Sequence, residues 1–193
     1  MPRVRKLFPI YGSSLANNML SAIVHDRVVA QFVAAYVADH DRRGILGGPA
    51  RDRELAETVG REILLAMIVE VNEALPSFFG KKPKSKLKAE EAEAINSFFR
   101  ELLAALARAQ NWNGEDRRQF RRDLALYSDF RARREKAANS RKKGKLPDEE
   151  APFIARVALL LDPSMLEQAR RSARKFYGNI GQMARQHLRK TLG

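Results

Sequence analysis

The sequence contains no cysteine and only three histidines among its 193 residues. Without cysteine there is no disulfide framework, no thiolate nucleophile and no cysteine-ligated metal, and the composition fits a reducing cytoplasm. The sequence also lacks a Walker loop and a His-Glu-x-x-His zinc motif. We therefore expect a protein without an active site, and we expect no cofactor and no bound metal.

Long hydrophobic runs are also missing. The most apolar segment, ILLAMIVEV at residues 63–71, is nine residues long and contains Glu70. A helix that crosses a bilayer needs about 20 mostly apolar residues, and the basic N-terminal stretch is not followed by the apolar run of a secretory signal. These features predict a cytoplasmic protein with no membrane partner.

Basic residues are abundant and unevenly distributed. Residues 1–80 hold nine basic and nine acidic residues, whereas residues 81–193 hold 27 basic and 14 acidic ones, so the whole net charge of +13 lies in the second part. A neutral part joined to a basic part indicates a scaffold and a surface for a polyanion. We expect residues 1–80 to serve packing or docking and residues 81–193 to form a nucleic-acid-binding surface.

The periodicity of apolar residues indicates an all-α fold. It predicts a bundle of about six helices, arranged as one unit or as two lobes that meet near residues 80–88. We expect a first helix from an N-cap at Ser13 or Ser14 to Gly44, and a second from Asp52 to Pro76. The remaining helices are expected over residues 88–110, 115–139 and 152–161, and from an Asp162-Pro163 cap to about residue 190.

Two of these expected helices carry most of the basic residues. Over residues 115–139, Phe120, Leu124 and Tyr127 form an inward stripe, and a basic face lies elsewhere on the helix. Over residues 163–190, an apolar stripe with 3-4 spacing again leaves a basic face. The candidate nucleic-acid-binding residues are Arg118, Arg122, Arg133, Lys136, Arg171, Arg174, Arg185 and Arg189, together with Arg141, Lys142 and Lys143 of the basic connector.

Arginine dominates both faces, and its planar guanidinium group suits bidentate phosphate contacts and stacking on bases. No acidic residue occurs between Gln168 and Gly193, so that helix forgoes favourable pairs between side chains four residues apart. A polyanion would offset the resulting repulsion. The alternative interpretation is a solvated, arginine-rich face with no ligand.

Several smaller features remain open at this stage. Gly178 and Gly181 indicate a helix break, tight helix packing or a close approach of a phosphate backbone. Trp112 and Tyr177 could stack on bases. Two His-Asp dipeptides, at residues 25–26 and 40–41, are similar to the metal-binding pair of HD phosphohydrolases, but their separation on one expected helix argues against a shared metal site.

No zinc finger, RNA-recognition signature or standard helix-turn-helix spacing is present, which favours sequence-independent binding to a single-stranded DNA or RNA backbone. In its basic helical character, carried by residues 117–136 and 166–190, the chain resembles the small subunits of CRISPR–Cas effector complexes. That resemblance implies a non-catalytic ribonucleoprotein subunit in antiviral defence, with other subunits or further copies of itself as protein partners. The alternatives are a stand-alone helical DNA-binding regulator and an HD-type metal phosphohydrolase.

Overall fold

The protein is all-α, as the sequence predicts. A computed structural model describes residues 2–24, 28–40, 49–78, 88–139 and 150–192. The described helices are α1 (Pro2–Val24), α2 (Val28–His40), α3 (Pro49–Phe78), α4 (Ala89–Ala109), α5 (Gly114–Asn139), α6 (Pro152–Leu161) and α7 (Leu166–Leu192), with a single 3-10 turn, η3 (Pro163–Met165), before α7. No strand occurs within these residues.

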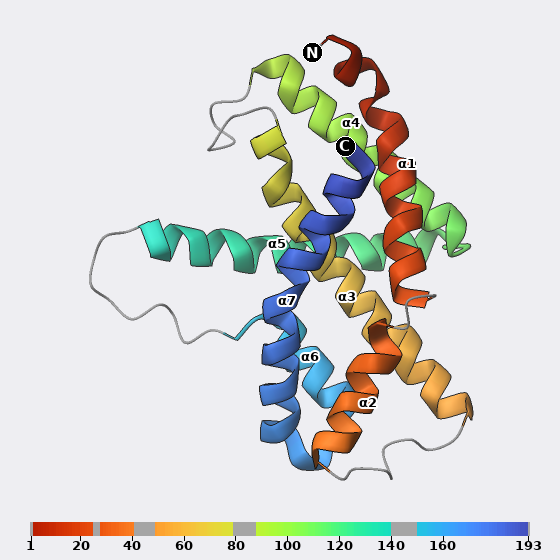
Figure 1. Cartoon of the computed structure of the whole chain (residues 1–193), viewed down its shortest axis with the longest axis vertical. Coiled ribbons are helices and arrows are strands. Elements are labelled where there is room, and N and C mark those ends of the chain that lie inside the picture. Colours follow the sequence, from red (N-terminus) through yellow and green to blue (C-terminus); the bar gives the residue numbers. More distant parts are fainter. Residues whose placement is uncertain (1, 25–27, 41–48, 79–87, 140–149, 193) are drawn as a thin grey trace.

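α3 runs through the middle of the bundle (Figure 1). Every residue from Glu62 to Val69 is buried, because α7, α6 and α5 all pack against this helix. A helix that is apolar on all sides over two turns can only be stable in a core. The segment that is most apolar in the sequence is therefore also the centre of the fold.

The other helices lie around α3. α1 lies alongside α4, α6 packs on α7, and α5 crosses the bundle and extends beyond it at its C-terminal end (Figure 1). One hydrophobic core includes Leu15 of α1, Phe98 of α4, Phe153 of α6 and Ile180 of α7. Residues before and after position 80 thus share one core, and the boundary in charge does not coincide with a boundary in packing.

Gly12 allows the close contact between α1 and α4. A Cβ atom at this position would lie 2.6 Å from the carbonyl oxygen of Phe98 and 3.0 Å from the backbone nitrogen of Leu102. Both are backbone atoms of α4 and cannot rotate away. Beside this contact, the Ser13 hydroxyl donates a 2.6 Å hydrogen bond to Glu101, which joins the same two helices.

The expected start of the first helix is wrong. α1 begins at Pro2, and Ser13 and Ser14 lie inside it. The Ser14 hydroxyl is 3.5 Å from the carbonyl oxygen of Ile10, one turn earlier, which is how a serine inside a helix satisfies its own donor. The end expected at Pro76 is also too early, since α3 continues to Phe78. The expected stop at Gly44 lies outside the described residues.

The Asp162-Pro163 cap is confirmed. The Asp162 carboxylate accepts hydrogen bonds from the backbone N–H groups of Ser164 and Met165 and from the Ser164 hydroxyl. It also accepts a 3.2 Å hydrogen bond from the hydroxyl of Tyr36 on α2. Asp162 caps η3, which leads into α7, and it therefore also fixes this end of the last helix against α2.

The stretch from Ile10 to His40 is long and apolar enough to cross a membrane, by length and composition alone. Core helices of soluble proteins and N-terminal signal sequences meet the same criterion. Valines and alanines raise the average hydropathy here, and polar residues such as Asn17, Asn18 and Gln31 interrupt the apolar run. In this structure Leu15, Met19, Phe32 and Val33 of the stretch are buried in the core.

Candidate functional site

The eight candidate residues that lie within the described chain are all exposed, four on α5 and four on α7. They are spread along both helices. Arg118 and Lys136 are 18 positions apart on α5, which places them about 27 Å apart along its axis. Arg141, Lys142 and Lys143 lie outside the described residues.

Three of the candidate arginines have acidic partners. Arg118 pairs with Glu115 at 2.6 Å, Arg174 pairs with Glu150 at 3.1 Å, and Arg171 is 3.9 Å from Glu167. Glu150 precedes α6, and it reaches the basic face of α7 because α6 and α7 pack together. The expectation that this helix forgoes favourable ion pairs is therefore wrong for Arg171 and Arg174.

The C-terminal half of α7 differs from its start. Arg185 and Arg189, one helical turn apart, form no ion pair with a carboxylate of the described chain. With Ala74 and Ser77 near the end of α3, they line a shallow hollow of about 240 Å³. Arg122 and Lys136 on α5 are likewise exposed and without an ion pair among the described residues. These four are the candidate residues with charge available to a ligand.

α3, α5 and α7 come together at Glu70. Its carboxylate is 3.6 Å from the guanidinium group of Arg131 on α5, and a Cβ atom at Gly181 of α7 would lie 3.1 Å from Glu70 Oε2. The space at Gly181 is limited by the ends of the Glu70 and Arg185 side chains, since Arg185 Nη1 would lie 3.4 Å from the same Cβ atom, while a Cβ atom at Gly178 would meet nothing within 4 Å. α7 continues through both glycines, so neither marks a helix break.

Tyr177 and its neighbour Phe176 both pack against other aromatic rings of the bundle. Tyr177 stacks on Phe153, with ring centroids 5.4 Å apart, and Phe176 packs against Phe32 at 4.4 Å. Burial and the negative charge of Glu70 raise the pKa of Tyr177, and Arg131 and Arg134 oppose that shift. Both side chains of α7 thus belong mainly to the packing of the bundle.

Trp112 is held in the turn between α4 and α5. Asn111 adopts a left-handed conformation with φ of 51°, and the backbone N–H groups of Asn111 and Trp112 bond to the carbonyls of Arg108 and Ala107. This is a Schellman motif, which ends α4 and turns the next side chain back onto it. Asn113 then begins α5 by accepting bonds from the N–H groups of residues 115 and 116.

This turn creates a small basic hollow of about 220 Å³ between α4 and α5. We call it the Trp112 hollow; its walls include Leu103, Trp112 and Phe120, and its rim includes Arg100, Arg117 and Arg121. The Trp112 and Phe120 rings are 4.5 Å apart, so Phe120 supports the indole from the core. Arg117 and Arg121 are not among the candidate residues predicted from the sequence. Their spacing of four residues next to the only tryptophan was the available signal.

A buried ionic network joins α3, α5 and α6, and the sequence analysis missed it. Arg156 lies between two buried carboxylates, 3.3 Å from Glu62 and 2.9 Å from Asp123. Asp123 also pairs with Arg61 at 3.0 Å, and Glu62 accepts a hydrogen bond from the Tyr127 hydroxyl. The sequence signal for this network was Glu62, a glutamate at the start of the apolar run of α3.

The network shifts the pKa of two of its members, Tyr127 and Arg156. Burial and the negative charge of Glu62 raise the pKa of Tyr127 well above its ordinary value. Burial of Arg156 would by itself lower the pKa of this side chain, but the hydrogen bond to Asp123 and the charge of Glu62 outweigh that effect and raise it. Each charged group has an oppositely charged neighbour, and the Tyr127 hydroxyl has a carboxylate acceptor, so the network is suited to holding α3, α5 and α6 together.

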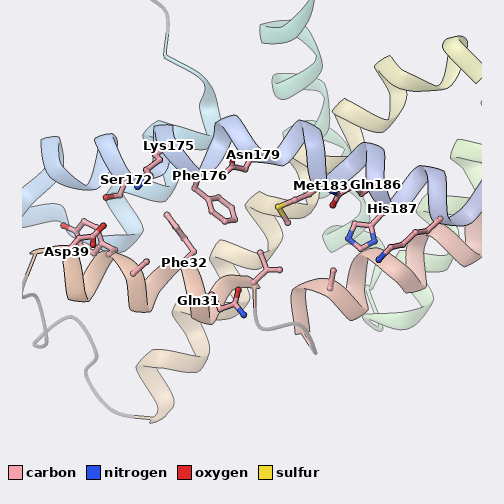
Figure 2. A pocket seen from close by; sticks show the side chains of 15 residues that line it. Gln31, Phe32, Asp39, Ser172, Lys175, Phe176, Asn179, Met183, Gln186 and His187 are labelled. Atoms are coloured by element: carbon pink, nitrogen blue, oxygen red, sulfur yellow. The ribbon is translucent and has the colours of Figure 1, made fainter.

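A larger groove of about 490 Å³ lies between α2 and α7. Figure 2 shows Phe32 and Phe176 facing each other across it, with Asp39 and Lys175 toward one end and Met183 and His187 toward the other. Its rim carries both signs of charge. Within the described chain nothing indicates what would cover this groove.

The described residues contain no group of three His, Asp or Glu side chains that could hold a metal ion. His40 Nε2 lies 3.3 Å from the Ser172 hydroxyl, and its ring packs against the edge of Tyr36. The rest of the two His-Asp dipeptides, residues 25, 26 and 41, lies outside the described residues. His40 therefore has a packing role in this structure.

Comparisons of this chain with protein-family models, with curated protein sequences and with solved structures found no match.

Proposed function

We propose that this protein is a non-catalytic, basic α-helical subunit that holds the backbone of single-stranded DNA or RNA without sequence specificity. The observation that carries the proposal is the exposed pair Arg185 and Arg189, which has no acidic partner among the described residues. Like charges one turn apart on a helix repel, and this costs a few tenths of a kcal/mol. Two neighbouring phosphates of a bound strand, one at each arginine, would offset that repulsion.

The charge distribution supports the same function. The full excess of +13 lies in residues 81–193, and α5 and α7 together hold 15 basic and six acidic residues, a net charge of +9. Arg122 and Lys136 extend the available charge along α5, so a flexible single strand could contact separate patches. A rigid duplex could contact those patches only if they lay along the path of its backbone.

The CRISPR effector small-subunit resemblance is retained as the more specific form of this proposal. In that form, the proposal is that the protein acts in the cytoplasm as part of a ribonucleoprotein complex for antiviral defence, beside other subunits or further copies of itself. Within the structure, the docking of other proteins would use surfaces away from Arg185 and Arg189.

The test is a salt titration of oligonucleotide binding. Fluorescently labelled single strands of mixed sequence are titrated with protein at several salt concentrations, and anisotropy gives the affinity. For single strands the logarithm of the affinity falls with the logarithm of salt with a slope of about −0.7 for each neutralised phosphate. The double variant Arg185→Gln/Arg189→Gln should therefore reduce the magnitude of the slope by about 1.4.

A matched control is Arg53→Gln/Arg108→Gln. It changes net charge equally, but both of these exposed arginines are paired with glutamates. We expect it to have a much smaller effect on the slope. Equal effects of the two double variants would refute a specific role for Arg185 and Arg189, and absence of binding at low salt would refute the function. A marked preference for one sequence would indicate a DNA-binding regulator instead.

Thermal unfolding of the same variants separates binding from stability. The two arginines lie near the negatively polarised C-terminal end of α3, and cations near a helix C-terminus are stabilising. If that were their whole role, Arg185→Gln/Arg189→Gln would lower the melting temperature and leave the affinity unchanged.

A further inference from the structure

The Trp112 hollow combines an aromatic wall with a cationic rim. The turn that carries Trp112 is fixed at both ends, by the Schellman motif of α4 and by the Asn113 cap of α5. Phe120 lies behind the indole at the core side. The indole is therefore held in place before any ligand arrives, which lowers the entropic cost of binding.

The rim is suited to an anion. Arg121 is exposed and has no ion pair within the described chain. Arg117 donates from Nε to the carbonyl oxygen of Trp112 at 3.2 Å, which orients its guanidinium group beside the ring. Arg100 pairs with Glu93 at 2.5 Å, on the α4 side. Arg117 and Arg121 therefore carry positive charge that no ion pair within the described chain neutralises.

The size of the hollow limits the ligand. Sites for drug-sized molecules and cofactors enclose about 300–1,000 Å³, and this hollow encloses about 220 Å³. It is too small for a dinucleotide or a large cofactor. A flat aromatic ring that stacks on the indole, with an anionic group reaching the rim, fits both its size and its chemistry.

We propose that the Trp112 hollow binds one unpaired base of a single-stranded nucleic acid, with Trp112 contacting the base and Arg117 and Arg121 contacting the adjoining phosphates. This inference rests on the proposed function, because it names a subsite for the same ligand. Bases in a duplex are paired and stacked on each other, so the subsite selects single strands over duplexes. Every base has an aromatic face, so it need not select among sequences.

The single tryptophan makes the subsite directly observable, since intrinsic tryptophan fluorescence reports on Trp112 alone. We expect a single-stranded oligothymidylate to quench this fluorescence at low salt, and to saturate at the protein concentration where anisotropy saturates. A duplex of the same length should bind with far less quenching. The measurement uses the unmodified full chain.

Variants then test the contribution to affinity. Trp112→Ala should weaken single-strand binding by about 5- to 150-fold, the range found when stacking aromatics are replaced by alanine. Trp112→Phe should retain most of the affinity. Because Trp112 packs on Phe120, circular dichroism must show that both variants are folded. Arg121→Gln, an exposed change outside the core, provides an independent variant that should weaken binding and reduce quenching.

The outcomes separate the two proposals. Oligonucleotide binding with unchanged Trp112 fluorescence, and with full affinity in Trp112→Ala and Arg121→Gln, would overturn the subsite and leave the proposed function standing. Equal quenching by single strands and duplexes would overturn the stacking contact. If no oligonucleotide binds at low salt, the proposed function fails and the subsite fails with it.

Discussion

Removal of Arg156 tests whether the buried ionic network holds α3, α5 and α6 together. The side chains of Glu62 and Asp123 are only 7% and 9% exposed, and Arg156 lies between them. After Arg156→Met, Asp123 would still have Arg61 as a partner, but Glu62 would have only the Tyr127 hydroxyl. Breaking a buried pair in this way costs about 3–5 kcal/mol, because a charge is left buried without compensation.

We expect a loss near the lower end, about 3 kcal/mol, because the Arg156 side chain is 35% exposed and water can partly replace it. That is a large fraction of the roughly 5–15 kcal/mol that stabilises a typical domain. The matched control is Arg118→Met, which removes an arginine from a pair whose side chains are 65% and 62% exposed. An exposed pair contributes at most about 1 kcal/mol.

Urea unfolding near neutral pH measures the difference in unfolding free energy between each variant and the unmodified protein. Tryptophan fluorescence and far-ultraviolet circular dichroism both monitor the transition, and coincident transitions verify two-state behaviour. Adding Glu62→Gln to Arg156→Met should recover part of the loss, because the neutral amide needs no counter-charge and can still accept from Tyr127. Equal costs for Arg156→Met and Arg118→Met, or no recovery in the double variant, would refute the reasoning.

Two further predictions concern stability. Gly178→Ala should raise the free energy of unfolding by about 1 kcal/mol, because alanine is the better helix former and a Cβ atom there meets nothing within 4 Å. Gly12→Ala should instead lower the free energy of unfolding by about 1–3 kcal/mol, because its Cβ atom would meet the backbone of α4. Urea titrations with opposite signs for the two changes would support this, and equal signs would contradict it. Tyr127 has a raised pKa in the folded state, so the unfolded chain loses this proton first and stability should fall above about pH 10 by up to about 1.4 kcal/mol per pH unit. Tyr127→Phe should make that alkaline decline shallower, and an unchanged decline in the variant would show that Tyr127 does not contribute to it.

Much of the secondary structure could be predicted because helix signals are local. The expected helix over residues 88–110 matches α4, and the one over residues 115–139 matches α5. The inward positions of Phe120 and Tyr127 are also confirmed, since helical periodicity assigns them to the same face. The start at Ser13 or Ser14 was wrong because a serine can cap a helix or bond within it, and the sequence does not distinguish the two.

The sequence by itself determined the all-α class, the amphipathic faces of α5 and α7, and the concentration of positive charge after residue 80, because each depends on composition or on spacing along the chain. Only the tertiary structure decided which cations remain available. Glu150 neutralises part of the basic face of α7 from a distant segment, whereas Arg185 and Arg189 form no ion pair among the described residues, although Glu70 lies near Arg185 on the other side of Gly181. The hollow beside Trp112 likewise appears only in the structure, because its walls include Leu103 of α4 as well as Phe120 of α5.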